Sequence, residues 1–200
     1  MAVLWSERHE NACKVTPITP DNTYSHVLGG HGAHPLALDA VTLRPETAAD
    51  EDFLYVVYAS TRTEELAVVP WTYEQKDAFL RQQYAAQYAH YHNSGYYPNP
   101  TFLIVEVGGH AAGRLYVHRS GGEILVVDIA LLPAYRGAGI GSALLNDLLA
   151  EAGRTGAVVR LHVEPWNRAV RLYERLGFRH TGEEGLYWTM ERSPGEAADD

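Results

Sequence analysis

The stretch VVDIALLPAYRGAGIGSALLNDLLAEAG, residues 126–153, passes from an apolar run through three closely spaced glycines into a helical pattern. Its second half carries one apolar stripe at helical spacing, formed by Leu144, Leu145, Leu148, Leu149 and Ala152. A strand that turns directly into a helix leaves free N–H groups and the positive end of the helix dipole at the turn. Glycines let the backbone approach a ligand without an intervening Cβ. The stretch therefore predicts an anion site, above all one for phosphate.

Two common phosphate motifs fit this turn poorly. A nucleotide P-loop requires a lysine, and none occurs near residues 137–142. A dinucleotide fingerprint would need glycine where Ser142 stands, although Glu164 ends the next predicted strand as a ribose-binding acid would. The hairpins predicted upstream also contradict a doubly wound parallel sheet. A tight connection without a ligand would need only one or two glycines.

Composition limits the function classes. With 200 residues, 46% hydrophobic and 20% charged, the chain can bury one sizeable core. Its net charge of −9 and its two lysines disfavour nucleic-acid and anionic-membrane partners and mildly favour a cationic amine. Cys13 is a lone cysteine, the first residues lack a signal-peptide pattern, and no apolar run approaches about 18 residues. We expect a soluble cytoplasmic protein.

The chain divides into three parts. Residues 1–38 show no sustained periodicity and read as an N-terminal extension. The histidines at 26, 31 and 34 match no metal-ligand spacing, so no metal is implied. Residues 39–192 form the predicted domain, and residues 193–200 form an acidic tail that we expect to be disordered.

Within the domain the pattern predicts an α+β fold, with antiparallel strands followed by a βαβ unit. Thr72 is the expected N-cap of the second helix, and glycine pairs at 108–109 and 121–122 predict hairpins. Expected strands lie at 41–45, 101–107, 111–119, 123–131, 157–163, 178–182 and 186–192, and expected helices at 46–62, 72–92, 141–152 and 167–176.

Two segments carry a specific family resemblance. RGAGIG, residues 136–141, fits the Q/R-x-x-G-x-G/A signature of the GNAT superfamily of acetyl-CoA-dependent N-acyltransferases. NRAVRLYERLGF, residues 167–178, resembles the family's later helix with its alanine, Leu-Tyr pair and Gly-Phe. TLRPETAADEDFL, residues 42–54, is similar to the usual first strand and helix. The resemblance covers about residues 41–192.

This resemblance implies a mixed, mostly antiparallel twisted sheet with helices on both faces, splayed between its fourth strand (123–132) and its fifth (157–163). Acetyl-CoA would lie in the gap. The backbone of Ile129, Ala130 and Leu131 would pair with the pantetheine arm. The pyrophosphate would lie on the segment formed by Arg136, Gly137, Ala138, Gly139, Ile140, Gly141 and Ser142.

The resemblance also assigns two residues of the later helix. Tyr173 matches the family's general-acid tyrosine, which would protonate the departing thiolate, although its position also suits packing with Ala169 and Leu176. Asn167 matches a ligand-contacting asparagine, but only one residue instead of two separates it from Ala169. Asn167 is equally suited to be the N-cap of that helix.

The general base is the least determined residue. Asp128 interrupts an apolar strand close to the expected thioester, where a carboxylate is costly unless paired, solvated or used. Simple alternation places Asp128 with Val126 and Ala130, so it could also bond a neighbouring strand. His162, Glu164 and a water molecule are the alternatives.

The sequence therefore predicts an N-acetyltransferase that moves an acetyl group from the co-substrate acetyl-CoA to a primary amine by direct attack. The alternative is a catalytically silent module that binds acyl-CoA. The acceptor could be a small molecule or a peptide, and a homodimer is left open. Acceptor choice would come from the first two helices, where the stripe Tyr84, Tyr88 and Tyr91 suits either a core or an aromatic wall for an ammonium group.

Overall fold

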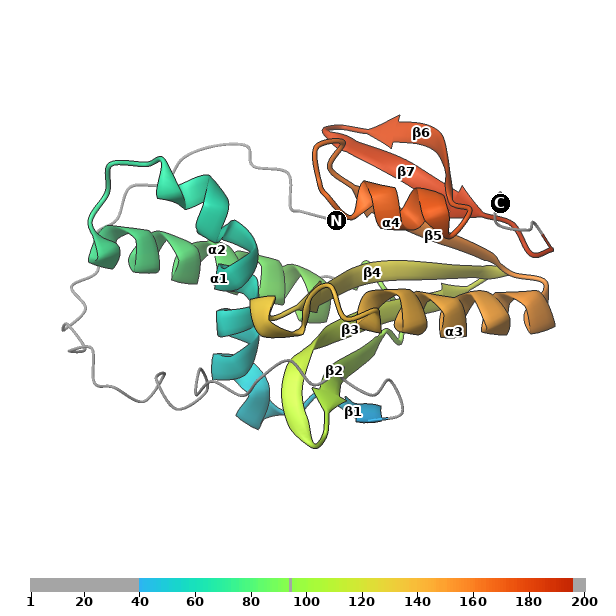
Figure 1. Cartoon of the computed structure of the whole chain (residues 1–200), viewed down its shortest axis with the longest axis horizontal. Helices are drawn as coiled ribbons and strands as arrows, with labels where there is room; N and C mark the ends of the chain where they lie inside the picture. The colour runs from blue at the N-terminus through green and yellow to red at the C-terminus, as the bar shows by residue number, and fades with distance from the viewer. Residues whose placement is uncertain (1–39, 94, 196–200) are drawn as a thin grey trace.

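The computed structural model describes residues 40–93 and 95–195. The predicted extension and most of the predicted acidic tail lie outside these residues. Figure 1 shows a single open sheet flanked by helices. The strands are β1 (Val41–Pro45), β2 (Thr101–Val107), β3 (His110–Ser120), β4 (Glu123–Leu131), β5 (Val158–Val163), β6 (Arg179–Glu184) and β7 (Tyr187–Arg192). The helices are α1 (Glu51–Ala67), α2 (Tyr73–Asn93), α3 (Ile140–Thr155) and α4 (Val170–Arg175).

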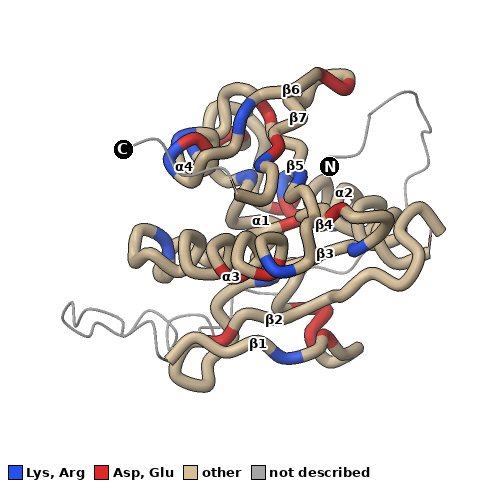
Figure 2. Tube along the Cα trace, turned by 90° about the vertical axis from the view of Figure 1, so that its right-hand side faces the viewer, with Lys and Arg blue, Asp and Glu red and all other residues tan. Residues whose placement is uncertain are grey.

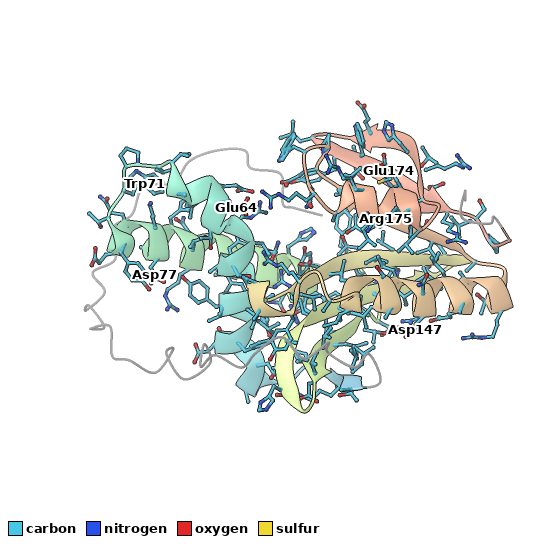
Figure 3. The ribbon with its side chains drawn as sticks, viewed as in Figure 1. Glu64, Trp71, Asp77, Asp147, Glu174 and Arg175 are labelled. Atoms are coloured by element: carbon cyan, nitrogen blue, oxygen red, sulfur yellow. The ribbon has the colours of Figure 1, made fainter. Side chains whose placement is uncertain are left out.

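The sheet has the strand order β1-β2-β3-β4-β5-β7-β6. Its neighbouring strands are antiparallel except for β4 and β5, which run parallel and are joined through α3. This arrangement confirms the predicted antiparallel hairpins followed by a βαβ unit. Parallel neighbouring strands require a long crossover, and α3 forms it here. The apolar stripe of α3 covers the sheet, and Asp147 points away from the sheet (Figure 3).

Side chains that alternate along the strands produce an apolar cluster on each face of the sheet. One face packs against α3 and α4 and contains Val105, Val117, Val126, Ile140, Leu144, Leu145, Leu148, Leu161, Val170 and Tyr173. The other face packs against α1 and α2 and contains Leu54, Tyr58, Tyr84, Tyr91, Ile104, Tyr116 and Val127. Helices on both faces were predicted, and the two clusters confirm them.

The helix boundaries follow local capping. The Oγ1 atom of Thr72 accepts a hydrogen bond from the Gln75 amide, and the Gln75 side chain accepts one from the Thr72 amide. This reciprocal pair confirms Thr72 as the N-cap of α2. The predicted helix at 167–176 was too long at its start, because residues 167–169 form a turn before α4 begins at Val170.

Charged residues are dispersed over the described chain. Figure 2 shows basic and acidic positions interspersed along the trace, with arginines on β1, β3, α3, β5 and α4. Binding to a nucleic-acid backbone relies instead on a stripe of clustered Lys and Arg. Within residues 40–93 and 95–195, no helix is both long and apolar enough to cross a membrane.

Candidate active site

A β-bulge redirects the side chains of β4. Tyr116 of β3 pairs with Asp128, but the next residue, Val117, pairs with Val126, so Val127 is an extra residue on β4. Val126 faces α3, whereas Asp128 lies opposite Tyr116 on the face covered by α1 and α2. The alternation that placed Asp128 with Val126 is therefore wrong at this point. Asp128 does share its face with Ala130, which pairs with Arg114 on the same strand as Tyr116.

The fourth and fifth strands separate just beyond the bulge. Their pairing covers four residues and ends at Val126 and Leu161. This separation confirms the predicted splay of the sheet. A cavity of about 180 Å³ opens there, lined by Tyr58, Thr61, Arg62, Glu65, Gln87, Tyr91, Arg114, Val126, Val127, Asp128, Ile129, Ala130, Leu161, His162, Val163, Glu164, Asn167, Tyr173 and Tyr187. The predicted residues Asp128 and Tyr173 thus meet at one cavity, whereas Leu131 and residues 136–142 lie outside its lining.

Asp128 is held by two other elements. Its Oδ2 atom lies 2.6 Å from Nη2 of Arg114 on β3 and 3.4 Å from the hydroxyl of Tyr91 on α2. The same Nη2 donates to Oε1 of Gln87 at 2.9 Å. Burial, the largest single influence, lowers the pKa of the Arg114 guanidinium, but Asp128 together with the phenols of Tyr116 and Tyr91 outweighs burial and raises this pKa above its usual value. Arg114 and Asp128 therefore form a buried ion pair. This pair meets the expectation that a carboxylate in this strand is paired.

Tyr173 lies on α4 with 7% of its surface exposed, and its ring makes an edge contact with Phe178. Burial raises the pKa of its phenol, and the negative charge of Asp128 raises it further. The hydroxyl therefore keeps its proton through the neutral range. The ring packs in the core and the residue also lines the cavity, so its packing is compatible with the predicted donor role.

The open edge of β4 offers backbone groups to a ligand. The Leu132 amide donates to the Ala112 carbonyl on β3. Since backbone groups alternate in direction along an antiparallel strand, those of Leu131 and Ile129 face the opposite edge, where β5 has separated. The backbone of Ala130, by the same alternation, faces β3. Ala130 lines the cavity, but its backbone groups point toward β3 and are not available to a ligand on the open side of β4.

Arg136 joins the end of β4 to α1. Its Nε donates to the Leu131 carbonyl at 2.7 Å, and its Nη2 donates to Oγ of Ser60 at 3.0 Å. The guanidinium is thus engaged by protein acceptors rather than directed at the glycine turn. The sequence predicted residue 136 as part of the cofactor-binding segment, and its side chain makes contacts that brace the strand against the helix.

The glycine turn fits an anion. Gly137 and Gly139 adopt φ values of 76° and 84°, which L side chains rarely adopt. The first N–H groups of any α-helix have no acceptor within the helix. Gly139 is the N-cap of α3 and has no side chain that could accept from them, so these groups are available to a ligand. Ile140 is buried and Ala138 packs against the same cluster, so these residues can reach a ligand only through their backbone.

Asn167 lines the cavity, and its Oδ1 accepts a hydrogen bond of 2.9 Å from the Ala169 amide. This contact stabilises the turn that leads into α4. The N-cap of α4 is Ala169, so the prediction of Asn167 as the N-cap was wrong by two residues.

Charged side chains from α1 and from the end of β5 line part of the cavity. Nη1 of Arg62 lies 3.1 Å from Glu65 on its own helix and 3.8 Å from Glu164. Glu64, labelled in Figure 3, contacts Arg168 beside the same turn. His162 also lines the cavity, and burial lowers its pKa below the usual histidine value. Three carboxylates and two guanidiniums line the cavity, so the formal charge of its lining is negative when His162 is neutral.

Sequence reasoning missed Arg114, Gln87 and Arg62. Arg114 gave a usable signal, since an arginine inside the apolar strand AAGRLYV is as anomalous as an aspartate inside ILVVDIALL. Gln87 and Arg62 gave none, because helices α1 and α2 present several polar residues each. Two members of the aromatic stripe, Tyr84 and Tyr91, are buried in the core, and Tyr88 packs against it. Of the three, Tyr91 also lines the cavity.

Among the described residues, no three His, Cys, Asp or Glu side chains gather as metal ligands would. Cys13 and the histidines at 26, 31 and 34 lie outside the described residues.

The chain is similar in sequence and in fold to known acetyltransferases. The chain is 29% identical over 145 residues to a candidate ribosomal protein bS18-alanine N-acetyltransferase of Bacillus subtilis, covering 70% of this chain and 82% of that protein. It is 38% identical over 72 residues to the glucosamine 6-phosphate N-acetyltransferase of Trypanosoma brucei brucei, covering 36% of this chain and 41% of that protein.

Among solved structures, the PaiA N-acetyltransferase of Thermoplasma acidophilum in complex with coenzyme A has a similar fold, with a TM-score of 0.58 at 19% identity. That match covers 76% of this chain and 98% of the other. Residues 60–178, more than half of the chain, match the acetyltransferase (GNAT) family. The protein described here belongs to the GNAT family of N-acetyltransferases.

Proposed function

We propose that this enzyme transfers an acetyl group from acetyl-CoA to a primary amine by direct attack within a ternary complex. The observation that carries the proposal is the single cavity, at the point where β4 and β5 separate, that is lined by both Asp128 and Tyr173. A carboxylate and a protonated phenol at one site match the two proton transfers that this reaction requires.

The co-substrate would bind along the open edge of β4. Ile129 would pair with the pantetheine amides through its outward N–H and carbonyl groups. Leu131 would contribute its N–H, because its carbonyl already accepts a hydrogen bond from Arg136. The amides of residues 137–142 would hold the pyrophosphate, supported by the dipole of α3. Ala130 would flank the thioester, and Arg136 would support the loop by bracing the strand end. Asn167, which caps the turn before α4, would border the pantetheine.

The bound thioester supplies an electrophilic carbonyl carbon and a thiol leaving group. Asp128, directly or through water, would accept a proton from the acceptor ammonium so that the nitrogen lone pair can form the C–N bond. Tyr173 would donate its proton to sulfur as the C–S bond breaks, and the second proton that the nitrogen loses would restore the Tyr173 phenol. The products are the amide, the free thiol and one proton, which Asp128 passes to solvent. No oxidant or reductant enters this balance.

A second candidate for the base is His162. It lines the same cavity, and its burial-lowered pKa keeps the imidazole neutral and able to accept a proton at pH 7. The variants Asp128→Asn and His162→Gln separate the two, because only loss of the working base lowers kcat by the roughly hundredfold or more typical of general-base catalysis.

The decisive experiment measures binding and turnover separately. Calorimetry with acetyl-CoA should give a saturable heat. Release of free thiol should then be followed with a panel of amines that includes a peptide with N-terminal alanine and glucosamine 6-phosphate, the acceptors named in the related proteins. Heat without thiol release from any amine would favour a silent acyl-CoA-binding module. Absence of heat at millimolar acetyl-CoA would overturn the proposal.

A further inference from the structure

We infer that Arg114 is a positioning residue for the reaction, which ties down one oxygen of Asp128 and leaves the other for the acceptor. The inference rests on the proposed role of Asp128 as the base. Oδ2 of Asp128 contacts Arg114 and Tyr91. Oδ1 has no hydrogen-bond partner among the described residues and is not one of their buried unpaired atoms. Oδ1 is therefore the oxygen that remains accessible at the cavity.

The bulge in β4 makes this contact possible. Arg114 is paired in register with Ala130, not with Asp128, so its guanidinium reaches the carboxylate diagonally across the two strands. Without the extra residue at Val127, Asp128 would face α3 and could not meet Arg114. A backbone irregularity and a buried cation thus act on the same carboxylate.

Gln87 completes the arrangement from α2. Its Oε1 shares Nη2 of Arg114 with Asp128, at 2.9 Å and 2.6 Å respectively. The Arg114 side chain is only 4% exposed. A guanidinium held by acceptors from two elements has little freedom to rotate, and it transmits that restriction to the carboxylate. The position of Asp128 is consequently fixed by β3 and α2 together.

Charge compensation alone would give the same ion pair, since a buried guanidinium needs a carboxylate. The two roles differ in what happens when Asp128 loses its function. A positioning residue has nothing left to position in Asp128→Asn, whereas a structural residue contributes equally in both backgrounds.

The test is a double-mutant cycle with Arg114→Met and Asp128→Asn, assayed by thiol release with whichever amine of the panel reacts fastest. Arg114→Met should lower kcat about tenfold or more and change KM for acetyl-CoA less than about twofold. The same substitution in the Asp128→Asn background should lower kcat less than about twofold. Equal loss in both backgrounds would overturn the inference.

Two further variants guard against simple misfolding. Gln87→Leu leaves the guanidinium in place and should lower kcat in the same direction by a smaller factor. Arg119→Met is the matched control, because Arg119 lies on the same strand and is also ion-paired, to Glu151 at 2.6 Å, but does not line the cavity. Its kcat should equal that of the unaltered enzyme.

A crystal structure of Arg114→Met provides a readout independent of the acceptor. The Asp128 carboxylate should rotate so that neither oxygen keeps the position now held by Oδ2, and an unmoved carboxylate would overturn the inference. The proposed function fails separately: if Asp128→Asn keeps full kcat, the base assignment is wrong. If Asp128→Asn is slow and Arg114→Met is not, only the positioning role is wrong.

Discussion

Val126 and Asp128 lie on opposite faces of the sheet although one residue separates them along β4. Regular alternation would put both on the same face, and the extra residue at Val127 reverses it. The reversal brings a carboxylate into the cavity that Tyr173 lines on the other side. The proposed base therefore reaches the cavity because of this one irregularity.

Tyr173→Phe should lower kcat roughly hundredfold or more, the usual contribution of a general acid, because the departing thiolate loses its proton donor. Affinity for acetyl-CoA should stay unchanged by calorimetry, since the ring is retained in the core. Tyr187→Phe is the control, because it removes another phenol of the cavity lining. Equal kcat for Tyr173→Phe and the unaltered enzyme would rule out the donor role.

The pH dependence of kcat follows from the pKa of Tyr173. A donor acts only while protonated, so activity is present below its pKa and is lost as the pH rises through it. Burial, then the charge of Asp128, raises this pKa above the usual tyrosine value of about 10. We expect kcat to show no alkaline decline up to about pH 9.5. A decline below that pH which disappears in Tyr173→Phe would contradict this expectation.

Gly139→Ala should weaken acetyl-CoA binding, as calorimetry can measure. An alanine at a φ of 84° is strained by about 1–2 kcal/mol, so the backbone amides that would hold the pyrophosphate should shift. Gly153→Ala in the same helix is the matched control, because nothing lies within 4 Å of the added Cβ. It should raise the free energy of unfolding by about 0.5–1 kcal/mol and leave binding unchanged. Unaltered affinity in Gly139→Ala would argue against the phosphate role.

Gly113→Ala should destabilise the fold by about 1–3 kcal/mol or more, because the new Cβ would lie 2.2 Å from the Ala130 carbonyl oxygen and 3.0 Å from Cα of Leu131. The clash is with backbone, so relief requires β4 to shift. Gly182→Ala on β6 meets nothing within 4 Å and should be tolerated. Urea unfolding of both variants measures the difference, and equal midpoints would contradict the close approach of β3 and β4.

Asn167→Ala should lower the free energy of unfolding by about 1 kcal/mol, because the Ala169 amide loses its side-chain acceptor. Asn167→Asp keeps an oxygen acceptor there and should restore stability. Acetyl-CoA affinity should be similar in both variants. Weaker binding in both, with stability intact, would show that the side chain contacts the co-substrate instead.

Much of the fold was predictable from residue order. Periodicity and glycine pairs, which depend on neighbours along the chain, predicted the hairpins and the βαβ unit. The splay between β4 and β5 was predicted from the family resemblance carried by the RGAGIG segment. The start of α4 was placed too early, because the Asn167 cap closes a turn before the helix begins. Periodicity does not distinguish such a turn from a first helical turn.

The site divides in the same way. The sequence by itself determined the strand, the glycine turn and the helix that follow one another from Val126 to Gly153, together with a tyrosine at position 173, because these depend on neighbours along the chain. Only the tertiary structure decided which face Asp128 occupies and which cation meets it. Arg114 is 14 residues from Asp128 and 27 from Gln87, so their contact depends on strand register and helix packing, which no local pattern encodes.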